Sequence, residues 1–242
     1  MNNATDGDLL IAFGLLRGGR LWNRPELVQQ AKLLYMDILH LSTIDSEGWL
    51  LLLPAVSGFE KSGNVVVNLS YLVFPSLLAA LTLVTDPASR QSLHRLINDG
   101  VRMIGLAAFG QWKLPPDWLQ VSRSSELAPA QGWPPRFSYD AIRIPLYLQW
   151  VGMLAPNEQE RFRNYWMSFG EDALPAWVNL STNARAPYPA SPGIRAVADS
   201  TGLTLPPGMP PRALTSNLDD RDYYSASLTL LATIMWKERH PV

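Results

Sequence analysis

The stretch from Ala4 to Trp22 reads ATDGDLLIAFGLLRGGRLW, and it sets the architecture expected for the rest of the chain. The apolar run that begins at Leu9 has the length of a helix, and the polar residues before it are of the types that cap helix N-termini. Asp6 and Asp8 are therefore expected at the N-terminus of a buried helix. On spacing alone, one of these carboxylates is expected to cap the helix and to interact favourably with its dipole.

The composition limits the function classes that need to be considered. A chain of 242 residues with 47% hydrophobic residues can bury a substantial core in one large domain or two small ones. Its formal net charge is -1 and it has no run of Lys or Arg, which argues against nucleic acid or an anionic membrane as the main partner. The absence of cysteine excludes disulfides and thiolate catalysis.

Neither a membrane span nor a leader is expected in this sequence. The longest apolar run, from Leu72 to Val84, is shorter than a membrane span and contains Pro75. The first residues, Met1 to Asn3, lead directly into the acidic stretch, with no basic region and no cleavage site, so no signal peptide is predicted.

The remaining sequence predicts helices joined by short connections. Apolar residues at helical spacing predict helices over 25–42, 70–84, 87–109, 139–153, 157–178, 194–200 and 219–236. Short apolar runs bounded by turn residues predict two hairpins, one pairing 49–56 with 65–67 and one pairing 119–121 with 127–130. Together, these helices and hairpins predict an all-α domain with small β-hairpin excursions.

A second stretch with candidate chemistry reads Phe137-Ser138-Tyr139-Asp140-Ala141-Ile142-Arg143. Ser138 or Asp140 is expected to begin a helix, and Arg143 follows Asp140 by one turn, close enough to pair with it. From spacing alone, this is a structural cap with a salt bridge.

Both stretches resemble the motifs of glycoside hydrolase family 8, which comprises endoglucanases, lichenases, chitosanases and oligoxylanases. The Asp-rich signature of that family is met in this sequence by Ala4, Thr5, Asp6, Gly7, Asp8, Ile11, Ala12 and Trp22. Gly14 and Gly18 stand where the family usually has small alanine-like residues, and Gly costs a helix interior about 1 kcal/mol against Ala. The string around Asp140 is similar to the family segment that holds the general base.

The resemblance implies an (α/α)6 barrel, of which this chain would be an incomplete version. In the family, about a third of the catalytic domain precedes the Asp-rich signature. Residues 1–242 are therefore expected to form a single catalytic-type domain that lacks the N-terminal helices of the barrel. Removing those helices would expose apolar flanks, so self-association through that face is expected.

The resemblance also implies roles for the acidic residues. Asp140 would be the general base of an inverting hydrolysis, with Arg143 holding its carboxylate ionised and oriented. Asp6 would grip the distorted sugar at the bond being cut, and Asp8 would cap the helix. The family's general acid is a Glu in a Gly-Gln-Ser-Tyr-Gly-like motif upstream of the signature. That motif is absent here, and the glutamates in unrelated contexts are Glu47, Glu60, Glu126, Glu158 and Glu171. Activity of this chain alone would therefore require an acid from elsewhere.

Several aromatic residues match the family's substrate-binding segments more loosely. Tyr71 lies in Asn-Leu-Ser-Tyr and Trp118 in Pro-Asp-Trp, and both segments resemble those that contact sugar. By the same resemblance, Tyr139, Tyr223 and Tyr224 would also bind substrate, together with Arg143. Tryptophans on predicted helices are expected in the core instead, namely Trp150, Trp166, Trp177 and Trp236.

No metal or cofactor is predicted. The histidines His40, His94 and His240 have no paired ligand spacing, and the glycines form no phosphate loop.

The function expected through the resemblance is endo-acting, inverting hydrolysis of β-1,4-glucan, with cellulose or carboxymethylcellulose as the leading substrate. Chitosan, lichenan and xylan stay open as substrates, and the resemblance implies a periplasmic or secreted location. Two other classes also stay open: a non-catalytic glucan-binding protein, and a structural helical repeat in which Asp6 and Asp140 do not converge.

Overall fold

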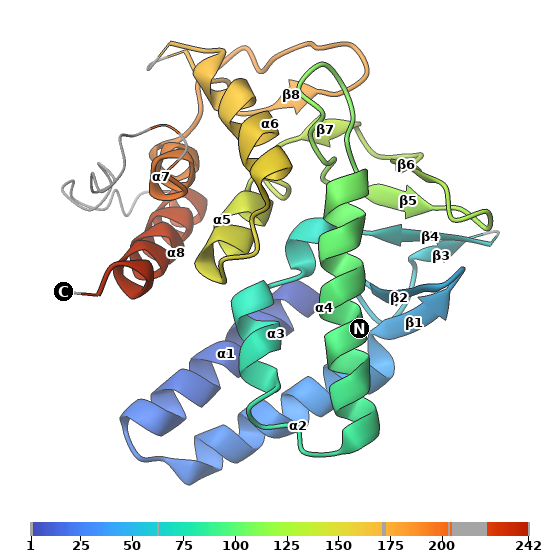
Figure 1. The fold of residues 1–242 in the computed structure, drawn as a ribbon, viewed down its shortest axis with the longest axis vertical. Helices are drawn as coiled ribbons and strands as arrows, with labels where there is room; N and C mark the ends of the chain where they lie inside the picture. The colour runs from blue at the N-terminus through green and yellow to red at the C-terminus, as the bar shows by residue number, and fades with distance from the viewer. Residues whose placement is uncertain (1, 62, 171–172, 203, 205–221, 242) are drawn as a thin grey trace. The chain divides into compact units, whose positions relative to one another are not determined.

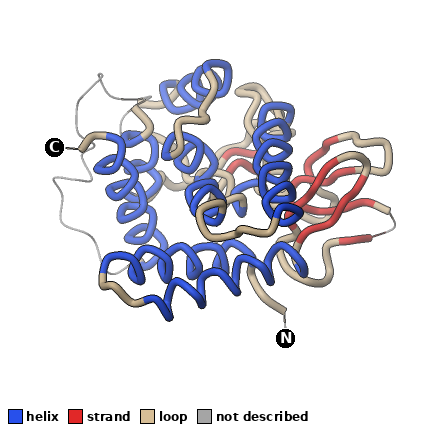
Figure 2. The backbone as a smooth tube through the Cα atoms, turned by 60° about the horizontal axis from the view of Figure 1, so that its bottom comes forward, coloured by secondary structure: helices blue, strands red, loops and turns tan. Residues whose placement is uncertain are grey.

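The computed structural model describes residues 2–61, 63–170, 173–202, 204 and 222–241, and helices are its main elements (Figure 1, Figure 2). The described helices are α1 Thr5–Leu21, α2 Pro25–Leu41, α3 Phe74–Ala80, α4 Pro87–Leu106, α5 Arg143–Trp150, α6 Pro156–Met167, α7 Pro192–Ser200 and α8 Tyr223–Arg239, with a 3-10 turn at Leu69–Tyr71. The strands are β1 Thr43–Ser46, β2 Trp49–Leu52, β3 Glu60–Lys61, β4 Asn64–Val67, β5 Leu119–Val121, β6 Leu127–Pro129, β7 Arg136–Phe137 and β8 Val178–Asn179.

The chain divides into two compact units, each of which is built from two segments. Unit 1 comprises 1–106 and 118–133, and unit 2 comprises 107–117 and 134–242. The single domain expected from the sequence stays a prediction, and each unit is described below by itself.

Unit 1 is organised around the hairpin of α1 and α2 (Figure 1). The helices approach closely at Gly19, where a Cβ atom would lie 2.7 Å from Val28 Cγ2 and 3.0 Å from the Arg24 carbonyl oxygen. Hydrogen bonds in the core tie α2 to α3 and α3 to α1. The Tyr35 hydroxyl lies 2.9 Å from Ser76 Oγ, which donates to the Leu9 carbonyl at 2.7 Å.

The start of α1 differs from the sequence prediction. Neither acidic residue occupies the N-cap position, which belongs to Ala4, and Asp6 and Asp8 lie inside the first turn. The predicted cap by Asp8 is therefore wrong. The position of the helix start is fixed by Thr5, whose amide donates to the Pro54 carbonyl at 3.0 Å and whose Oγ1 donates to the Leu53 carbonyl at 2.8 Å. This anchoring comes from residues far away in the sequence.

One of the two predicted hairpins is wrong. β2 pairs with β1 and not with β4, through a two-residue turn in which Glu47 and Gly48 have φ of 54° and 83°. Two successive positive φ angles are the backbone of a type I′ turn, whose twist matches that of the paired strands. β4 instead lies between β3 and β5 in a four-stranded sheet. The β5–β6 hairpin is confirmed, with Gln120 opposite Ala128.

In unit 2, three helices begin or end at residues other than those predicted from the sequence. α5 begins at Arg143, after a turn over 139–142, and α6 ends at Met167. The residues expected to extend α6 to 178 instead reach β8, because Val178 and Asn179 pair with Phe137 and Arg136 of β7. α8 begins at Tyr223 and is capped by Asp222, whose Oδ1 accepts from the amides of Tyr224 and Ser225 at 3.1 and 3.3 Å. The predicted start of this helix at 219 lies outside the described residues.

The tryptophans expected in the core differ in burial. Trp150 and Trp166 are buried as predicted, whereas Trp177 and Trp236 are half-buried. The expectation that Trp177 and Trp236 lie in the core is therefore wrong.

The helices α7 and α8 approach each other closely at Gly193. Its amide donates to Ser225 Oγ at 2.7 Å, and a Cβ atom at this position would lie 2.3 Å from the Ser225 carbonyl oxygen. Only glycine allows the two helices to approach this closely.

No helix in the described part of the chain is both long and apolar enough to cross a membrane.

Substituting Gly193 by Ala should destabilise the protein, because the added Cβ overlaps backbone atoms of α8 that cannot rotate away. We expect a loss of about 1–3 kcal/mol in the free energy of unfolding, measured by urea denaturation. Gly14→Ala is the matched control. Nothing lies within 4 Å of the position that a Cβ would take at Gly14, so this helical substitution should stabilise by about 0.5–1 kcal/mol. Equal effects of the two substitutions would contradict the packing described for α7 and α8.

Candidate active site

Asp140 lies in the turn over 139–142 that joins β7 to α5. Its side chain is 29% exposed, and its Oδ1 accepts a hydrogen bond from Arg143 Nη2 at 2.7 Å. Arg143 is itself 13% exposed, so this ion pair is shielded more than a pair on the open surface. The predicted pairing is confirmed, although the helix begins at Arg143 and not at Asp140. The result is a solvent-accessible carboxylate with a fixed cationic partner.

A second carboxylate, that of Asp117, holds this turn in place through hydrogen bonds. It is 8% exposed, and its Oδ1 accepts from the backbone amides of Ser138 and Ala141 at 3.0 and 2.8 Å. These two amides lie on either side of the Tyr139–Asp140 pair. Burial, together with the nearby Asp140 charge, raises the pKa of Asp117 from 3.8 to about 6, although the donated hydrogen bonds oppose that shift.

The turn is also held by tyrosines. The Tyr224 hydroxyl donates to the Tyr139 carbonyl oxygen at 2.6 Å, and the two rings meet edge to face with centroids 5.4 Å apart. Burial raises the pKa of Tyr224 well above its usual value. Burial and the hydroxyl of Tyr188 raise the pKa of Tyr139 to about 12. Tyr223, the first residue of α8, is 86% exposed.

In unit 1, Asp6 lies half-buried in the first turn of α1, and its Oδ1 accepts from the Gly7 amide at 2.9 Å. Asp8 is engaged differently, because its Oδ2 accepts from Asn3 Nδ2 at 2.7 Å. Asn3 Oδ1 in turn accepts from the Val56 amide at 2.9 Å. Asp8 therefore helps to fix the chain entering α1.

Unit 1 also contains a cluster of partly exposed aromatic rings around Trp118. Its ring stacks with those of Phe59 and Trp133, with centroids 5.8 and 5.4 Å away, and Tyr71 meets it edge to face at 6.1 Å. Two predicted substrate-binding residues, Tyr71 and Trp118, are thus neighbours. Flat aromatic faces of this kind suit sugar rings.

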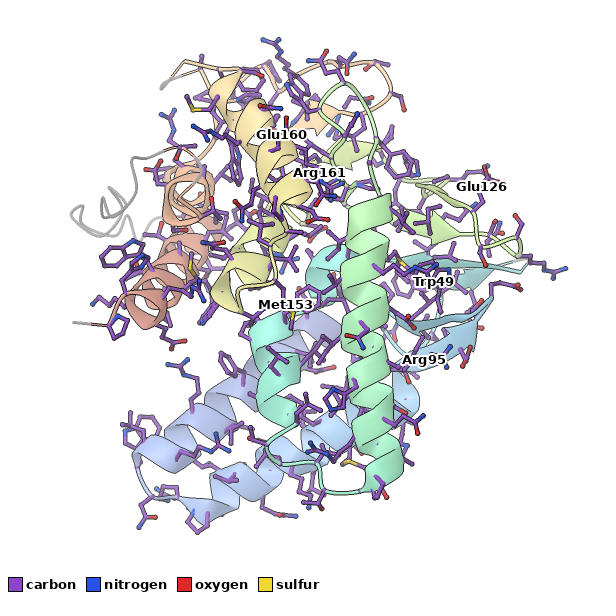
Figure 3. The ribbon with its side chains drawn as sticks, viewed as in Figure 1. Trp49, Arg95, Glu126, Met153, Glu160 and Arg161 are labelled. Carbon is purple, nitrogen blue, oxygen red and sulfur yellow. The ribbon has the colours of Figure 1, made fainter. Side chains whose placement is uncertain are left out.

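The described glutamates named in the sequence analysis occupy varied positions. Glu47 lies in the β1–β2 turn, Glu60 on β3, Glu126 in the β5–β6 hairpin and Glu158 buried on α6 (Figure 3 labels Glu126). Glu171 lies outside the described residues. The general acid is not assigned to any of these residues.

Comparison with known proteins shows the family of this chain. The family model described as glycosyl hydrolases family 8 matches residues 1–238. The chain belongs to this family.

Relatives agree with this assignment. A probable endoglucanase of Novacetimonas hansenii is 51% identical over 235 residues, which cover 96% of this chain and 66% of the relative. An endoglucanase of Cellulomonas uda is 34% identical over 90% of this chain and 58% of its own length. The chain thus spans just under two thirds of the length of the first relative and 58% of the length of the second.

The solved structure of the endo-beta-1,4-glucanase CMCax from Acetobacter xylinum is similar in fold. It matches 98% of this chain and 72% of its own with a TM-score of 0.89 at 49% sequence identity. The predicted fold class, the family 8 (α/α)6 type with small β excursions, is confirmed, and the helical-repeat alternative is set aside.

Within unit 2, the structure brings together four of the predicted site residues: Asp140, Arg143, Tyr139 and Tyr224. Asp6, Tyr71 and Trp118 belong to unit 1, and the family 8 roles of all these residues stay predictions. The sequence does not predict a role for Asp117, because the resemblance of the Pro-Asp-Trp segment to the family concerns its tryptophan. No local signal marks Asp117, because Asp is mostly exposed in proteins and the amides that bind it come from Ser138 and Ala141, 21 and 24 positions later.

The raised pKa of Asp117 predicts a specific pH dependence of stability. The unfolded carboxyl ionises near 3.8 and the folded one near 6, so this group's contribution to wild-type stability falls as pH rises through that window. Asp117→Asn cannot ionise and still offers an oxygen to both amides. Its unfolding free energy relative to wild type should therefore rise between pH 4 and 7, by up to about 3 kcal/mol, in urea denaturation.

Asp45→Asn is the matched control for this prediction. Asp45 is exposed and its hydrogen bond from Arg95 lowers its pKa, so the relative stability of that variant should fall slightly as pH rises through the acid range. An Asp117→Asn difference that is constant with pH would contradict the buried, raised-pKa carboxyl.

Proposed function

We propose that this protein hydrolyses internal β-1,4 linkages of a cellulose-like glucan with inversion, using Asp140 as the general base. The observation that supports this proposal most directly is the environment of Asp140. Its carboxylate is partly exposed, so a water molecule can reach it, and it is ion-paired with Arg143. Hydrogen bonds to Asp117 fix the turn that bears it. The endoglucanase relatives support the substrate class.

In the proposed reaction, Asp140 accepts a proton from a water molecule that attacks the anomeric carbon. A general acid gives a proton to the leaving glycosidic oxygen on the opposite face of the sugar. Inverting enzymes hold the two carboxyl groups about 6.5–9.5 Å apart so that this water fits between base and sugar. Arg143 keeps Asp140 ionised before the reaction, and Asp6 is proposed to hold the distorted sugar at the cleaved bond.

The location of the protein is also part of this proposal. A polymeric glucan is met outside the cytoplasm, so we propose a periplasmic or secreted enzyme, on the basis of family resemblance.

The direct test is reducing-sugar release from carboxymethylcellulose by the 242-residue chain and by its Asp140→Asn variant. We expect Asp140→Asn to lower kcat by about 10²–10⁴-fold, because an amide cannot accept the proton. Cello-oligosaccharide binding, measured by calorimetry, should change little. Activity that survives in Asp140→Asn would exclude this residue as the base. Binding without activity in both proteins would instead favour the non-catalytic glucan-binding alternative.

Asp117 should act on catalysis by positioning Asp140. Asp117→Ala removes the acceptor shared by the Ser138 and Ala141 amides, so Asp140 should lose its fixed orientation. We expect kcat on carboxymethylcellulose to fall by about 10- to 100-fold with KM nearly unchanged. Asp117→Asn keeps the acceptor and should recover most of the lost kcat. A purely structural role would instead lower the amount of folded enzyme, and kcat per folded molecule would stay constant.

A further inference from the structure

Asn68, the residue directly after β4, is a polar side chain enclosed in the core of unit 1. It is 2% exposed, and its Oδ1 accepts from the Ser70 amide at 3.1 Å and from the Ser70 hydroxyl at 2.8 Å. A backbone amide can only donate, so Oδ1 faces Ser70 and the donor Nδ2 faces the other way. Within the described part of the chain, no acceptor lies in hydrogen-bonding range of this buried Nδ2. Buried polar atoms nearly always have a partner, so a partner for Nδ2 is expected.

Asn68 lines a small internal cavity of unit 1. The other residues around it come from β2, the end of β4, the 3-10 turn, Leu72 and α4, and all of them except Leu50 are buried. About 10 Å³ of the cavity is open to the centre of a water-sized sphere. This is close to the minimum that one water molecule needs, and it leaves no room for a larger ligand.

The backbone of β2 presents further polar groups beside this cavity. In the described residues β2 pairs only with β1, so its second edge is free of strands. Successive residues of an antiparallel strand point their amide and carbonyl groups alternately towards and away from the partner strand. The Leu53 amide donates to the Ser42 carbonyl at 2.8 Å and continues the β1–β2 ladder. The backbone groups of Leu50 and Leu52 therefore point away from β1.

The free edge of β2 faces α4, the helix on the other side of the cavity. The Leu50 amide donates to Asp99 Oδ2 of α4 at 2.9 Å, and the strand lies beside this helix (Figure 1). The next groups along the same edge are the Leu50 carbonyl oxygen and the Leu52 amide. An acceptor and a second donor thus lie on the side of β2 where Asn68 Nδ2 is enclosed.

We propose that this cavity binds one ordered water molecule, which is an integral part of unit 1. The water accepts hydrogen bonds from Asn68 Nδ2 and the Leu52 amide, and it donates to the Leu50 carbonyl oxygen. Three hydrogen bonds are typical of a buried water, and they satisfy the enclosed donor together with the edge of β2. This inference is independent of the proposed function.

The bound water connects β2 to the turn that bears Tyr71. Asn68 caps this 3-10 turn through the Ser70 amide, and the Tyr71 ring meets that of Trp118 edge to face. Because the water fixes Nδ2, it also fixes the Oδ1 that holds Ser70. The water is therefore a positioning element for the turn, although it lies inside the core.

A crystal structure of the 242-residue chain, at a resolution that shows ordered water, tests the proposal. We expect one isolated density peak about 2.7–3.2 Å from Asn68 Nδ2, the Leu50 carbonyl oxygen and the Leu52 amide nitrogen. A cavity without density would overturn the proposal. A direct hydrogen bond from Asn68 Nδ2 to a protein acceptor would overturn it as well, because the donor would then need no water.

Two variants test the partners assigned to the water in the same crystal form. Asn68→Leu replaces the amide by an apolar side chain of similar size, and the density peak should disappear. Ser70→Ala is the matched control, because it removes the hydroxyl that donates to Asn68 Oδ1 and leaves Nδ2 unchanged, so the peak should stay. A peak that persists in Asn68→Leu, or that is lost equally in Ser70→Ala, would contradict the role of Nδ2. If Asn68→Leu does not fold, the wild-type density still decides.

Discussion

The arrangement of the candidate active site depends on one buried carboxylate oxygen. Asp117 Oδ1 accepts from the amides of Ser138 and Ala141, and these amides enclose the residue proposed to act as the base. Buried backbone amides must find acceptors, and a buried carboxylate must find donors. The two amides and the Asp117 carboxylate therefore satisfy each other's hydrogen-bonding requirement, and this leaves the turn few alternative conformations. The position of Asp140 follows from this mutual requirement.

The two carboxylates of this site have different environments and, by proposal, different tasks. Asp140 is partly exposed and paired with Arg143, which suits a group that must be ionised and reach water. Asp117 is buried next to that negative charge, and its pKa is raised. Neighbouring carboxyl groups whose environments differ in this way can divide catalysis and positioning between them. The cost of burying Asp117 is offset by the hydrogen bonds that it receives.

In unit 2, aromatic residues both pack in the core next to the turn and lie exposed on the surface beside it. Phe137, the residue before Ser138, is buried against Phe162 and Tyr165, with ring centroids 6.0 and 5.2 Å away. This packing anchors β7 directly before the turn. Tyr139, the first residue of the turn, is partly exposed, and its hydroxyl lies 3.3 Å from that of Tyr188. A rigid core next to an exposed set of rings is the arrangement expected of a pre-organised binding site.

The sequence by itself determined the family, through the motifs around Asp6 and Asp140, and it determined most helices, whose apolar residues recur at helical spacing. It also predicted the Asp140–Arg143 pair, because the two residues are only three positions apart in the sequence. It could not determine the partner of β2, the start of α1 at Thr5, the support by Asp117 or the half-buried position of Trp177. Each of these depends on residues about 10 to 50 positions apart or on a specific turn, and local periodicity carries no information on such contacts. Only tertiary structure, which satisfies distant donors and acceptors together, decided them.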